Sequence, residues 1–412
     1  MMKVRQFSFV VLFLLGLSLG STRLEGALSQ DHFTYVANLE MKKNIVSPEE
    51  QSLFADHFLR QHFLPWTEGG SQYGRDRIQA FFSAYMEKII ANGGKRGKGD
   101  KIAHNARLSD YPSLHLRAIT TDRIDIRGLP YHVRRNGGVN LILQASSVPR
   151  GTPLVISHRS WDRKWFFVET GFVCGWTQGK HIACVSDAFV EKWRHSPLIC
   201  VVKDDGNYRV GELYPVAKAD EQNWHILIPR GEMKKGARVK HVTLPRHQAA
   251  LFPLPLTYAN LARVANELTG KPYGWGGIGG ERDCSSLLRD LFSPFGIWLP
   301  RHSSDQAVEG GVYVDLSKMT REEKKAAIIR RGIPYLTLLW IKGHVMLYLG
   351  VKDGRPVVFH SFRRAILQTP EGGIEERQVA KSRITALEGE DAPRDLMGPI
   401  RGMVMLVREG GQ

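Results

Sequence analysis

The chain has 412 residues, of which 42% are hydrophobic, with 41 glycines and 20 prolines. This length and composition predict two to four folded domains and exclude a largely disordered chain. The formal net charge of +16 favours polyanionic surfaces such as a cell wall or membrane headgroups, whereas no zinc motif, helix-turn-helix or aromatic RNA-binding pattern points to nucleic acid.

Residues 1–27 have the pattern of a secretory signal peptide. Lys3 and Arg5 precede an apolar run from Phe7 to Leu19, and small and polar residues follow. This run is short for a membrane span, so we expect export and cleavage, with an uncleaved signal anchor as the alternative. The segment has no cysteine for a lipid anchor. We therefore expect a periplasmic or cell-envelope protein without a stable membrane anchor after cleavage.

Residues 28–115 are predicted to form a helical segment that packs on another domain. Ser47 is a plausible cap, Pro48 suits the first helical position, and apolar residues follow at helical spacing. A second helix is expected near 78–90, ending in a glycine- and lysine-rich loop through Asp100. No residue of this segment suggests chemistry.

Short strands with polar turns, at roughly ten-residue spacing, predict a small β-barrel over residues 116–195. The expected strands are 123–127, 141–144, 154–157, 165–168 and 171–176. The stretch from Gly151 to Gln178, which ends in Gly-Trp-Thr-Gln, resembles bacterial SH3 domains.

A weaker set of strands predicts a second such barrel over residues 196–250. These strands are 198–202, 209–214, 224–228 and 238–244. The proline-bearing stretch 245–255 is expected to be a linker into the last domain.

Cys284 lies in the first turn of a predicted helix, because the apolar residues Leu287, Leu288 and Leu291 follow it at helical spacing. Free backbone N–H groups and the helix dipole converge at such a position and favour a thiolate. Most cysteines are buried packing residues, so a nucleophile also needs a histidine base. The remaining cysteines are Cys174, Cys184 and Cys200. Cys174 and Cys184 could form a disulfide, or Cys174 could be only a core residue.

Two histidines lie on the two strands of a predicted hairpin. His344 begins an apolar strand that ends at Gly350, His360 lies on the partner strand 355–362, and residues 352–354 form the turn. A clean two-residue turn would put the histidines on opposite faces, because side chains alternate along a strand. We therefore predict an odd loop or a β-bulge that brings both to one face.

These motifs resemble the NlpC-type cysteine peptidases of bacterial cell walls. The matching stretches are Tyr-Gly-Trp-Gly-Gly from Tyr273, Asp-Cys-Ser-Ser-Leu around Cys284, Leu-Pro-Arg-His-Ser-Ser-Asp-Gln at 299–306, Gly-His-Val-Met-Leu-Tyr-Leu-Gly from Gly343 and Val-Val-Phe-His up to His360. The resemblance covers about residues 257–408 and places the last domain at 257–410. It implies an α+β fold: a papain-like catalytic domain after two SH3-like barrels and a helical segment.

The resemblance also implies roles for four residues. Cys284 would be the nucleophile, His344 the general base that later protonates the leaving amine, and His360 the group that orients His344, with His302 its nearest competitor. Tyr273 would donate a hydrogen bond to the oxyanion, a role acyl transfer requires. No metal or cofactor is implied.

Four further residues are candidates for contacts with the substrate. Asp283 and Ser285 flank the cysteine and could cap its helix or bind substrate. In family members with this layout, the first barrel walls the groove, and an acidic or aromatic side chain holds the substrate's N-terminal amine. Glu169 and Trp176 are the candidates here, although Trp176 could belong to the barrel core and Glu169 could face solvent.

The chain also departs from the family pattern at two positions. Ser286 and Met346 stand where the family usually has glycine, which predicts a cleft that is tighter or differently shaped near both.

The implied reaction is hydrolysis of the amide between γ-D-glutamate and a diamino acid in peptidoglycan stem peptides, through a thioester, by a monomeric enzyme. A non-catalytic wall-binding protein and an acyltransferase on the same fold are the alternatives. An apolar cleft beside the cysteine would favour a lipid acceptor, and a polar cleft with a carboxylate-binding group would favour peptidoglycan.

Overall fold

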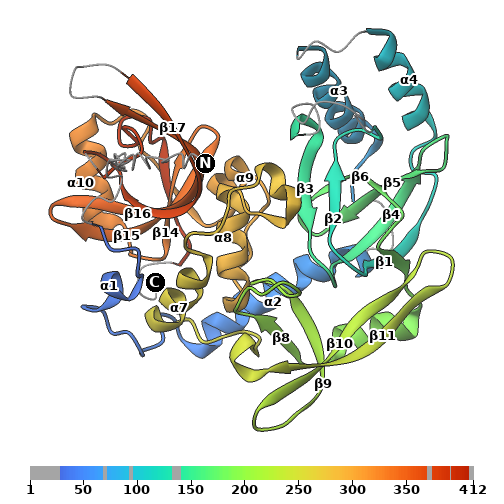
Figure 1. Ribbon diagram of the computed structural model, residues 1–412, viewed down its shortest axis with the longest axis horizontal. Coiled ribbons are helices and arrows are strands. Elements are labelled where there is room, and N and C mark those ends of the chain that lie inside the picture. The colour runs from blue at the N-terminus through green and yellow to red at the C-terminus, as the bar shows by residue number, and fades with distance from the viewer. Residues whose placement is uncertain are drawn as a thin grey trace, which may run out of the picture.

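The computed structural model describes residues 28–67, 72–91, 96–131, 141–368, 374–389 and 391–407. These residues form three antiparallel β-sheets with helices packed around them (Figure 1). The expected signal peptide lies outside the described residues. Within the described part of the chain, no helix combines the length and the apolar character needed to cross a membrane.

The N-terminal part is helical. Its helices are α1 (Phe33–Val36), α2 (Pro48–Thr67), α3 (Arg75–Ala91), α4 (Arg96–Ala106) and η1 (Leu108–Asp110). α2 begins at Pro48 as predicted, because a proline loses no helical hydrogen bond there. The loop expected through Asp100 is wrong from residue 96 onward. A Cβ at Gly99 would lie 2.9 Å from Met86 Cε, so the glycine lets α4 approach α3.

Helix α2 runs between the two halves of the molecule and is bonded to both (Figure 1). Near its start, Gln51 Nε2 donates to the carbonyls of Leu254 (2.7 Å) and Phe295 (3.2 Å). At its end, Trp66 Nε1 donates to the Ala118 carbonyl at 2.9 Å. These buried bonds fix the first β-sheet relative to the C-terminal part of the chain.

The first sheet has seven strands in the order β3-β2-β6-β5-β4-β1-β7. Its elements are β1 (Leu116–Thr120), β2 (Ile124–Arg127), β3 (Gln144–Val148), β4 (Pro153–Arg159), β5 (Trp165–Thr170), β6 (Cys174–Gln178), β7 (Ile182–Cys184) and the following helix α6 (Asp187–His195). The expected strand 141–144 is wrong at its start, since residues 141–143 are helical and β3 begins at Gln144.

The second sheet has five strands in the order β11-β10-β9-β8-β12. They are β8 (Leu198–Val201), β9 (Leu213–Ala219), β10 (Asn223–Glu232), β11 (Gly236–Pro245) and β12 (Ala249–Leu251), with η2 (Arg246–Gln248) before the last. Part of the expected linker is therefore a strand. Its backbone groups gain partners by pairing with β8.

The third sheet has six strands in the order β13-β18-β14-β15-β16-β17. They are β13 (Val312–Asp315), β14 (Thr337–Ile341), β15 (His344–Lys352), β16 (Arg355–Gln368), β17 (Ile374–Ala386) and β18 (Gly402–Met405). The accompanying helices are α7 (Tyr258–Leu268), η3 (Trp275–Gly280), α8 (Cys284–Phe292), η4 (Ser293–Phe295), α9 (Ser303–Glu309) and α10 (Arg321–Arg331).

The apolar faces of α7 and α8 form one buried core with this sheet. Leu287, Leu288 and Leu291, the spacing noted in the sequence, are fully buried there. Residues 363–391 had no predicted regular structure, but β16 and β17 pair along most of this segment.

The segment before α2 packs on this same half of the molecule through His32. His32 is fully buried, with Nδ1 2.9 Å from Tyr335 Oη and Nε2 3.2 Å from Thr269 Oγ1. The N-terminal segment is thus part of the C-terminal core.

Candidate active site

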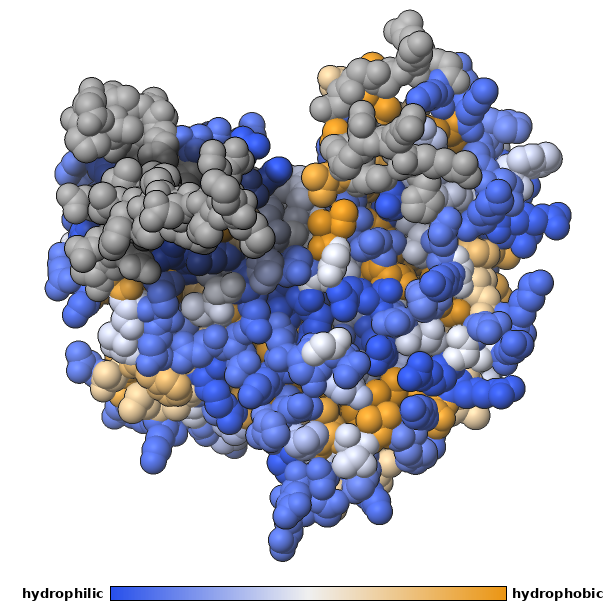
Figure 2. Space-filling model, in the orientation of Figure 1, coloured by the Kyte–Doolittle hydropathy of each residue, from blue (hydrophilic) through white to orange (hydrophobic). Residues whose placement is uncertain are grey.

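A cavity of about 1170 Å³ lies between the first and third sheets. Figure 2 shows the molecule hollowed between its two halves. The cavity brings together six of the eight candidate site residues, and its wall also includes part of the first sheet region. The six residues are Tyr273, Asp283, Cys284, Ser285, His344 and His360, and the wall from the first sheet region comprises Leu141, Ile142, Gln144 and Ala145.

Cys284 is the first residue of α8 and so lies in the first turn of a helix, as predicted. Asp283 is the N-cap: its Oδ1 accepts from the Ser286 N–H at 2.9 Å, and Ser286 Oγ accepts from the Asp283 N–H at 2.9 Å. This capping box satisfies backbone donors that the start of a helix leaves free. The cap fixes the backbone that carries the cysteine.

A second interaction of Asp283 ties α8 to the first sheet. Arg301 Nη2 lies 2.8 Å from Asp283 Oδ2, and Arg301 also donates to Ser285 Oγ at 3.0 Å and to Ser146 Oγ of β3 at 2.7 Å. Burial opposes ionisation of Asp283, but the Arg301 charge and the hydrogen bonds outweigh it, so the pKa of Asp283 lies below its usual value. Asp283 and Ser285 are therefore engaged with Arg301. No role was predicted for Arg301, although it lies in the 299–306 motif.

Arg282, just before the cap, anchors α8 on its other side. Its buried guanidinium lies 2.6 Å from Asp204 and 2.7 Å from Asp290. Asp204 follows β8, so this network joins the second sheet to the helix of Cys284.

The predicted hairpin irregularity is confirmed. Lys352 pairs with Arg355 across a two-residue turn, and a bulge between Tyr348 and Gly350 shifts the register by one. Gly350 has φ +111°, a value that favours glycine. The bulge offsets the even turn, so the two histidines meet instead of facing apart.

The hairpin forms a chain of three polar side chains. His344 Nε2 lies 2.8 Å from His360 Nδ1, and His360 Nε2 lies 3.0 Å from Thr385 Oγ1. Burial lowers the pKa of His344 to about 4, and burial, followed by the His344 charge, holds the pKa of His360 well below its usual range. Both rings are neutral at pH 7. Thr385 is a further site residue without a sequence signal. His302 lines the same cavity at the start of α9, but the bond to His344 comes from His360.

One consistent assignment of protons places Nε2–H on both imidazoles. His344 then donates to His360, and His360 donates to Thr385. This leaves Nδ1 of His344 as an unprotonated base.

The thiol is the resting form of Cys284. Burial, followed by the Asp283 charge, raises the pKa of Cys284 to about 12, while hydrogen bonds from the N–H groups of Val345 and Ser285 oppose the rise. Desolvation thus outweighs the stabilisation of the thiolate that was expected at the start of the helix. Deprotonation of Cys284 needs a partner that takes the proton.

Tyr273 lies before the glycine-bearing turn η3 and faces the cavity. Burial, followed by the Cys284 charge, raises the pKa of Tyr273, so its hydroxyl keeps the proton and can donate. The turn packs tightly on β3: Gly276 has φ +61°, and a Cβ there would lie 2.7 Å from Gln144. Gly276 N–H also donates to Asp283 Oδ2 at 3.1 Å, which fixes the turn to the cap.

Glu169 and Trp176 do not line this cavity, so the structure corrects their expected place. Both side chains are fully buried inside the first sheet. Glu169 accepts from the Gln72 N–H at 2.7 Å and the Tyr111 hydroxyl at 2.9 Å, and Trp176 packs against Phe167 with ring centroids 5.4 Å apart.

The two departures from the family pattern lie outside the cavity wall. The Ser286 side chain belongs to the capping box, and Met346 is fully buried in a core cluster; neither lines the cavity. All four cysteines are free, so the alternative disulfide between Cys174 and Cys184 is absent. Among the described residues, no three His, Cys, Asp or Glu side chains gather as metal ligands.

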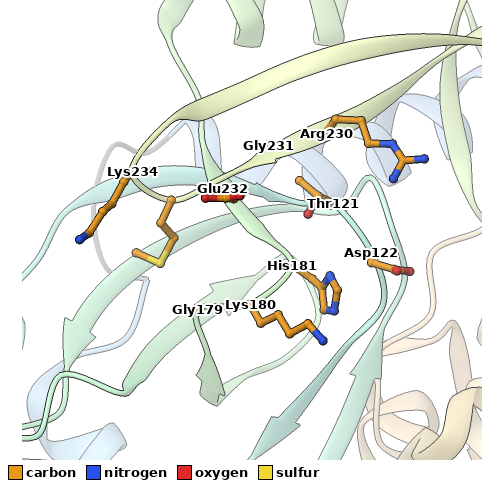
Figure 3. A pocket seen from close by; sticks show the side chains of 10 residues that line it. Thr121, Asp122, Gly179, Lys180, His181, Arg230, Gly231, Glu232 and Lys234 are labelled. Atoms are coloured by element: carbon orange, nitrogen blue, oxygen red, sulfur yellow. The ribbon is translucent and has the colours of Figure 1, made fainter.

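A second cavity, of about 620 Å³, lies between the first sheet and the β10–β11 hairpin (Figure 3). Its lining includes Asp122, Lys180, His181, Arg230 and Lys234. It contains no cysteine and none of the candidate residues, so the chemistry belongs to the larger cavity.

Known protein families match two regions of this chain. The family model NlpC/P60 matches residues 270–381, and a model for an SH3 domain of the SH3b1 type matches residues 142–178. Residues 270–381 are therefore similar to the NlpC/P60 family, a match that supports a cysteine peptidase, and residues 142–178 are similar to SH3 domains. No curated protein matches the sequence.

Solved structures share the fold. An NlpC/P60 endopeptidase from Photobacterium damselae subsp. piscicida aligns with a TM-score of 0.76 at 23% identity, covering 92% of this chain and 97% of that chain. An NlpC/P60 family protein from Bacillus cereus ATCC 10987 aligns with a TM-score of 0.50 at 16% identity, covering 71% of this chain and 100% of that chain. The first alignment spans both the barrel region and the peptidase domain.

Proposed function

We propose that this protein is an exported cell-wall endopeptidase that hydrolyses the amide between γ-D-glutamate and the diamino acid of peptidoglycan stem peptides. One observation carries the proposal: His344 is held at 2.8 Å by His360 on the wall of the cavity that contains Cys284. A nucleophile, a base and an orienting group on one wall are the requirements of thiol acyl transfer.

Proton transfer accompanies attack in this mechanism. Because the pKa of Cys284 is about 12 and that of His344 about 4, the resting pair is uncharged. The thiol proton passes to Nδ1 of His344 as sulfur bonds to the γ-carbonyl carbon. The charge of the imidazolium is stabilised through its Nε2–H bond to His360, whose own Nε2–H bonds to Thr385.

The tetrahedral intermediate collapses by losing the amine. The Tyr273 hydroxyl and a backbone N–H at the start of α8 donate to the oxyanion, and His344 returns the proton to the leaving amine of the diamino acid. Water then attacks the thioester, again with His344 as the base. This releases the D-glutamyl carboxylate and restores the thiol of Cys284.

The rest of the chain serves this reaction in the proposal. Residues 116–195 and 196–250 act as two barrels, the first of which walls the cavity, and the segment 28–115 fastens them to the catalytic domain 257–410. Cleavage of residues 1–27 on export brings the enzyme to its substrate. The net positive charge of the chain favours the anionic envelope.

Defined muropeptides test the proposal. The purified chain, its Cys284→Ala variant and a control variant, Cys184→Ala, are incubated with tri- and tetrapeptide stems and analysed by mass spectrometry. We expect a break between D-glutamate and the diamino acid with the native chain and the control, and none with Cys284→Ala. No cleavage by the native chain, or equal cleavage by Cys284→Ala, would contradict the proposal.

A further inference from the structure

The wall of the active-site cavity is strongly basic. Asp283 is the one carboxylate among its described residues, and Arg301 already neutralises it. Four further cationic side chains line the same space: Lys88, Arg363, Arg364 and Arg394. A cavity with such an excess of positive charge concentrates anionic ligands.

Two of these cations are engaged with neighbouring groups. Arg364 Nη1 lies 2.6 Å from Glu376 Oε1 in an exposed ion pair, and Lys88 Nζ lies 4.4 Å from the centre of the Tyr85 ring. Arg364 and Lys88 are therefore less available than an unpaired cation to bind a substrate.

Arg363 and Arg394 differ from Arg364 and Lys88 in being available to a ligand. Both are exposed to solvent, and neither has a carboxylate partner among the described residues. Arg363 lies three residues after His360 on β16, and its charge acts on Tyr273; Arg394 lies in the segment before β18, and its charge acts on His344. These two guanidinium groups therefore line the same cavity as the reacting groups.

The described part of the cavity wall also lacks a free carboxylate to pair with an ammonium group. Glu169, the carboxylate expected to hold a substrate's N-terminal amine, is buried inside the first sheet and accepts from Gln72 and Tyr111. In the described part of the wall, the pairing of Asp283 with Arg301 leaves no carboxylate for that task. A positively charged terminus would meet only like charges here, which is unfavourable.

On the basis of the proposed function, we infer that the site binds its substrate through carboxylates, held by Arg363 and Arg394, and does not require a free N-terminal amine. The proposed substrate offers these groups, because a γ-linked D-glutamyl residue keeps its α-carboxylate beside the scissile amide, and the diamino acid carries another. Arginine binds carboxylates through two parallel hydrogen bonds. The substrate class then includes stem peptides whose N-terminus is still acylated by the glycan strand.

Four versions of one stem tripeptide test this inference. The D-glutamyl α-carboxyl is either the free acid or the amide, and the N-terminus is either free or acetylated. With the native chain, we expect amidation to lower kcat/KM about 10- to 100-fold, the range of a charge-assisted hydrogen bond. Acetylation should change kcat/KM less than about 3-fold, because no ion pair of the amine with a carboxylate is lost.

Variants of Arg363 and Arg394 test whether these arginines cause the preference for the free acid over the amide. Arg363→Ala and Arg394→Ala should each raise KM for the free acid, and at least one should treat acid and amide alike. Arg394→Lys should keep part of the preference for acid over amide. Lysine keeps the positive charge but cannot form two parallel hydrogen bonds to a carboxylate. Lys352→Ala, which removes an exposed cation outside the cavity on the same hairpin, is the matched control and should behave as the native chain.

Binding to the full-length Cys284→Ala variant, measured by calorimetry, separates this inference from the proposed reaction. Tighter binding of the acid than of the amide would support the inference even if the native chain cleaved nothing. Equal affinity for acid and amide, or loss of binding and cleavage on acetylation, would overturn it, whether or not the amide bond is cut.

Discussion

The protonation of His344 sets the pH range of the proposed reaction. Burial lowers its pKa to about 4, and the Cys284 thiol has a pKa of about 12. Activity should be lost as the pH falls through about 4, because the imidazolium cannot accept the thiol proton. We expect kcat/KM to rise through pH 4 and then stay level across neutrality.

A pH–rate profile of muropeptide hydrolysis checks this, with enzyme returned from each pH to pH 7 as a control for unfolding. A midpoint near 6.5, the ordinary value for histidine, would show that His344 is not desolvated in the free enzyme.

Thr385 should be a positioning residue that acts through His360. Replacing it with valine keeps the shape but leaves His360 Nε2 without its partner at 3.0 Å. The lost bond favours the wrong tautomer, so we expect kcat of Thr385→Val to fall about 10-fold, the size of one hydrogen bond, with KM little changed. Thr385→Ser should restore most of kcat. A fall in thermal stability without a change in kcat would instead show a purely structural role.

The contrast between Cys284 and Arg301 shows what the sequence could predict about the site. The helical spacing after Cys284 and the alternation around His344 and His360 are local, so a short stretch of chain reveals them. The bonds from Arg301 to Asp283 and Ser146 join distant segments and appear only in the fold. Glu169 likewise looked available because its partner Tyr111 lies 58 residues away along the chain.

At the scale of elements, the bulge in β15 decides whether the hairpin forms a site. Gly350 adopts φ +111° there, although a Cβ would meet nothing closer than 3.6 Å. Gly350→Ala therefore tests backbone strain and not crowding, and should cost about 1–2 kcal/mol of unfolding free energy. Because the bulge pairs the two histidines, kcat should fall as well.

Urea unfolding and hydrolysis assays of the same preparation check this prediction. Gly206→Ala is the matched control, since Gly206 has open space around it and no positive φ, and it should leave both quantities unchanged. Equal stability of the two variants would mean that the bulge tolerates a side chain.

The long β16–β17 hairpin shows why other elements were not predicted. Its outer part, around Arg364 and Glu376, is exposed and charged, so it lacks the apolar alternation that marks a half-buried strand. Pairing of the two backbones, not burial, maintains it. The strand β12 was not predicted because it is only three residues long and lies within the proline-bearing stretch 245–255.

At the scale of the whole molecule, buried ion pairs connect the parts that form the cavity. Arg282→Met would remove the buried cation from the half-buried Asp204 and Asp290, although Asp290 would keep Arg289 at 3.5 Å. Breaking a buried ion pair typically costs about 3–5 kcal/mol, and we expect a value near the lower end of this range. We expect this loss in urea unfolding at pH 7. Lys43→Ala removes an exposed pair with Glu40 and should cost less than about 1 kcal/mol. A similar loss of unfolding free energy in Arg282→Met and Lys43→Ala would contradict a structural role for the Arg282 network.

The docked N-terminal segment should make the folded chain sensitive to acid. Burial lowers the pKa of His32 to about 3, whereas in the unfolded chain it is near 6.5. Between these values the unfolded state binds the extra proton, so the contribution of His32 to stability is complete above pH 6.5 and is lost as the pH falls towards 3. The expected slope is about 1.4 kcal/mol per pH unit within that window.

His32→Gln removes this titration while keeping a polar side chain beside Tyr335 and Thr269. The variant should be less stable at pH 7, but its unfolding free energy should decline less steeply between pH 6 and pH 4, by about 1.4 kcal/mol per unit. Urea titrations at several pH values measure this slope, and the exposed His115→Gln is the control that should keep the native slope. An unchanged slope in His32→Gln would mean that the N-terminal segment detaches before His32 is protonated, and that the C-terminal core does not depend on it.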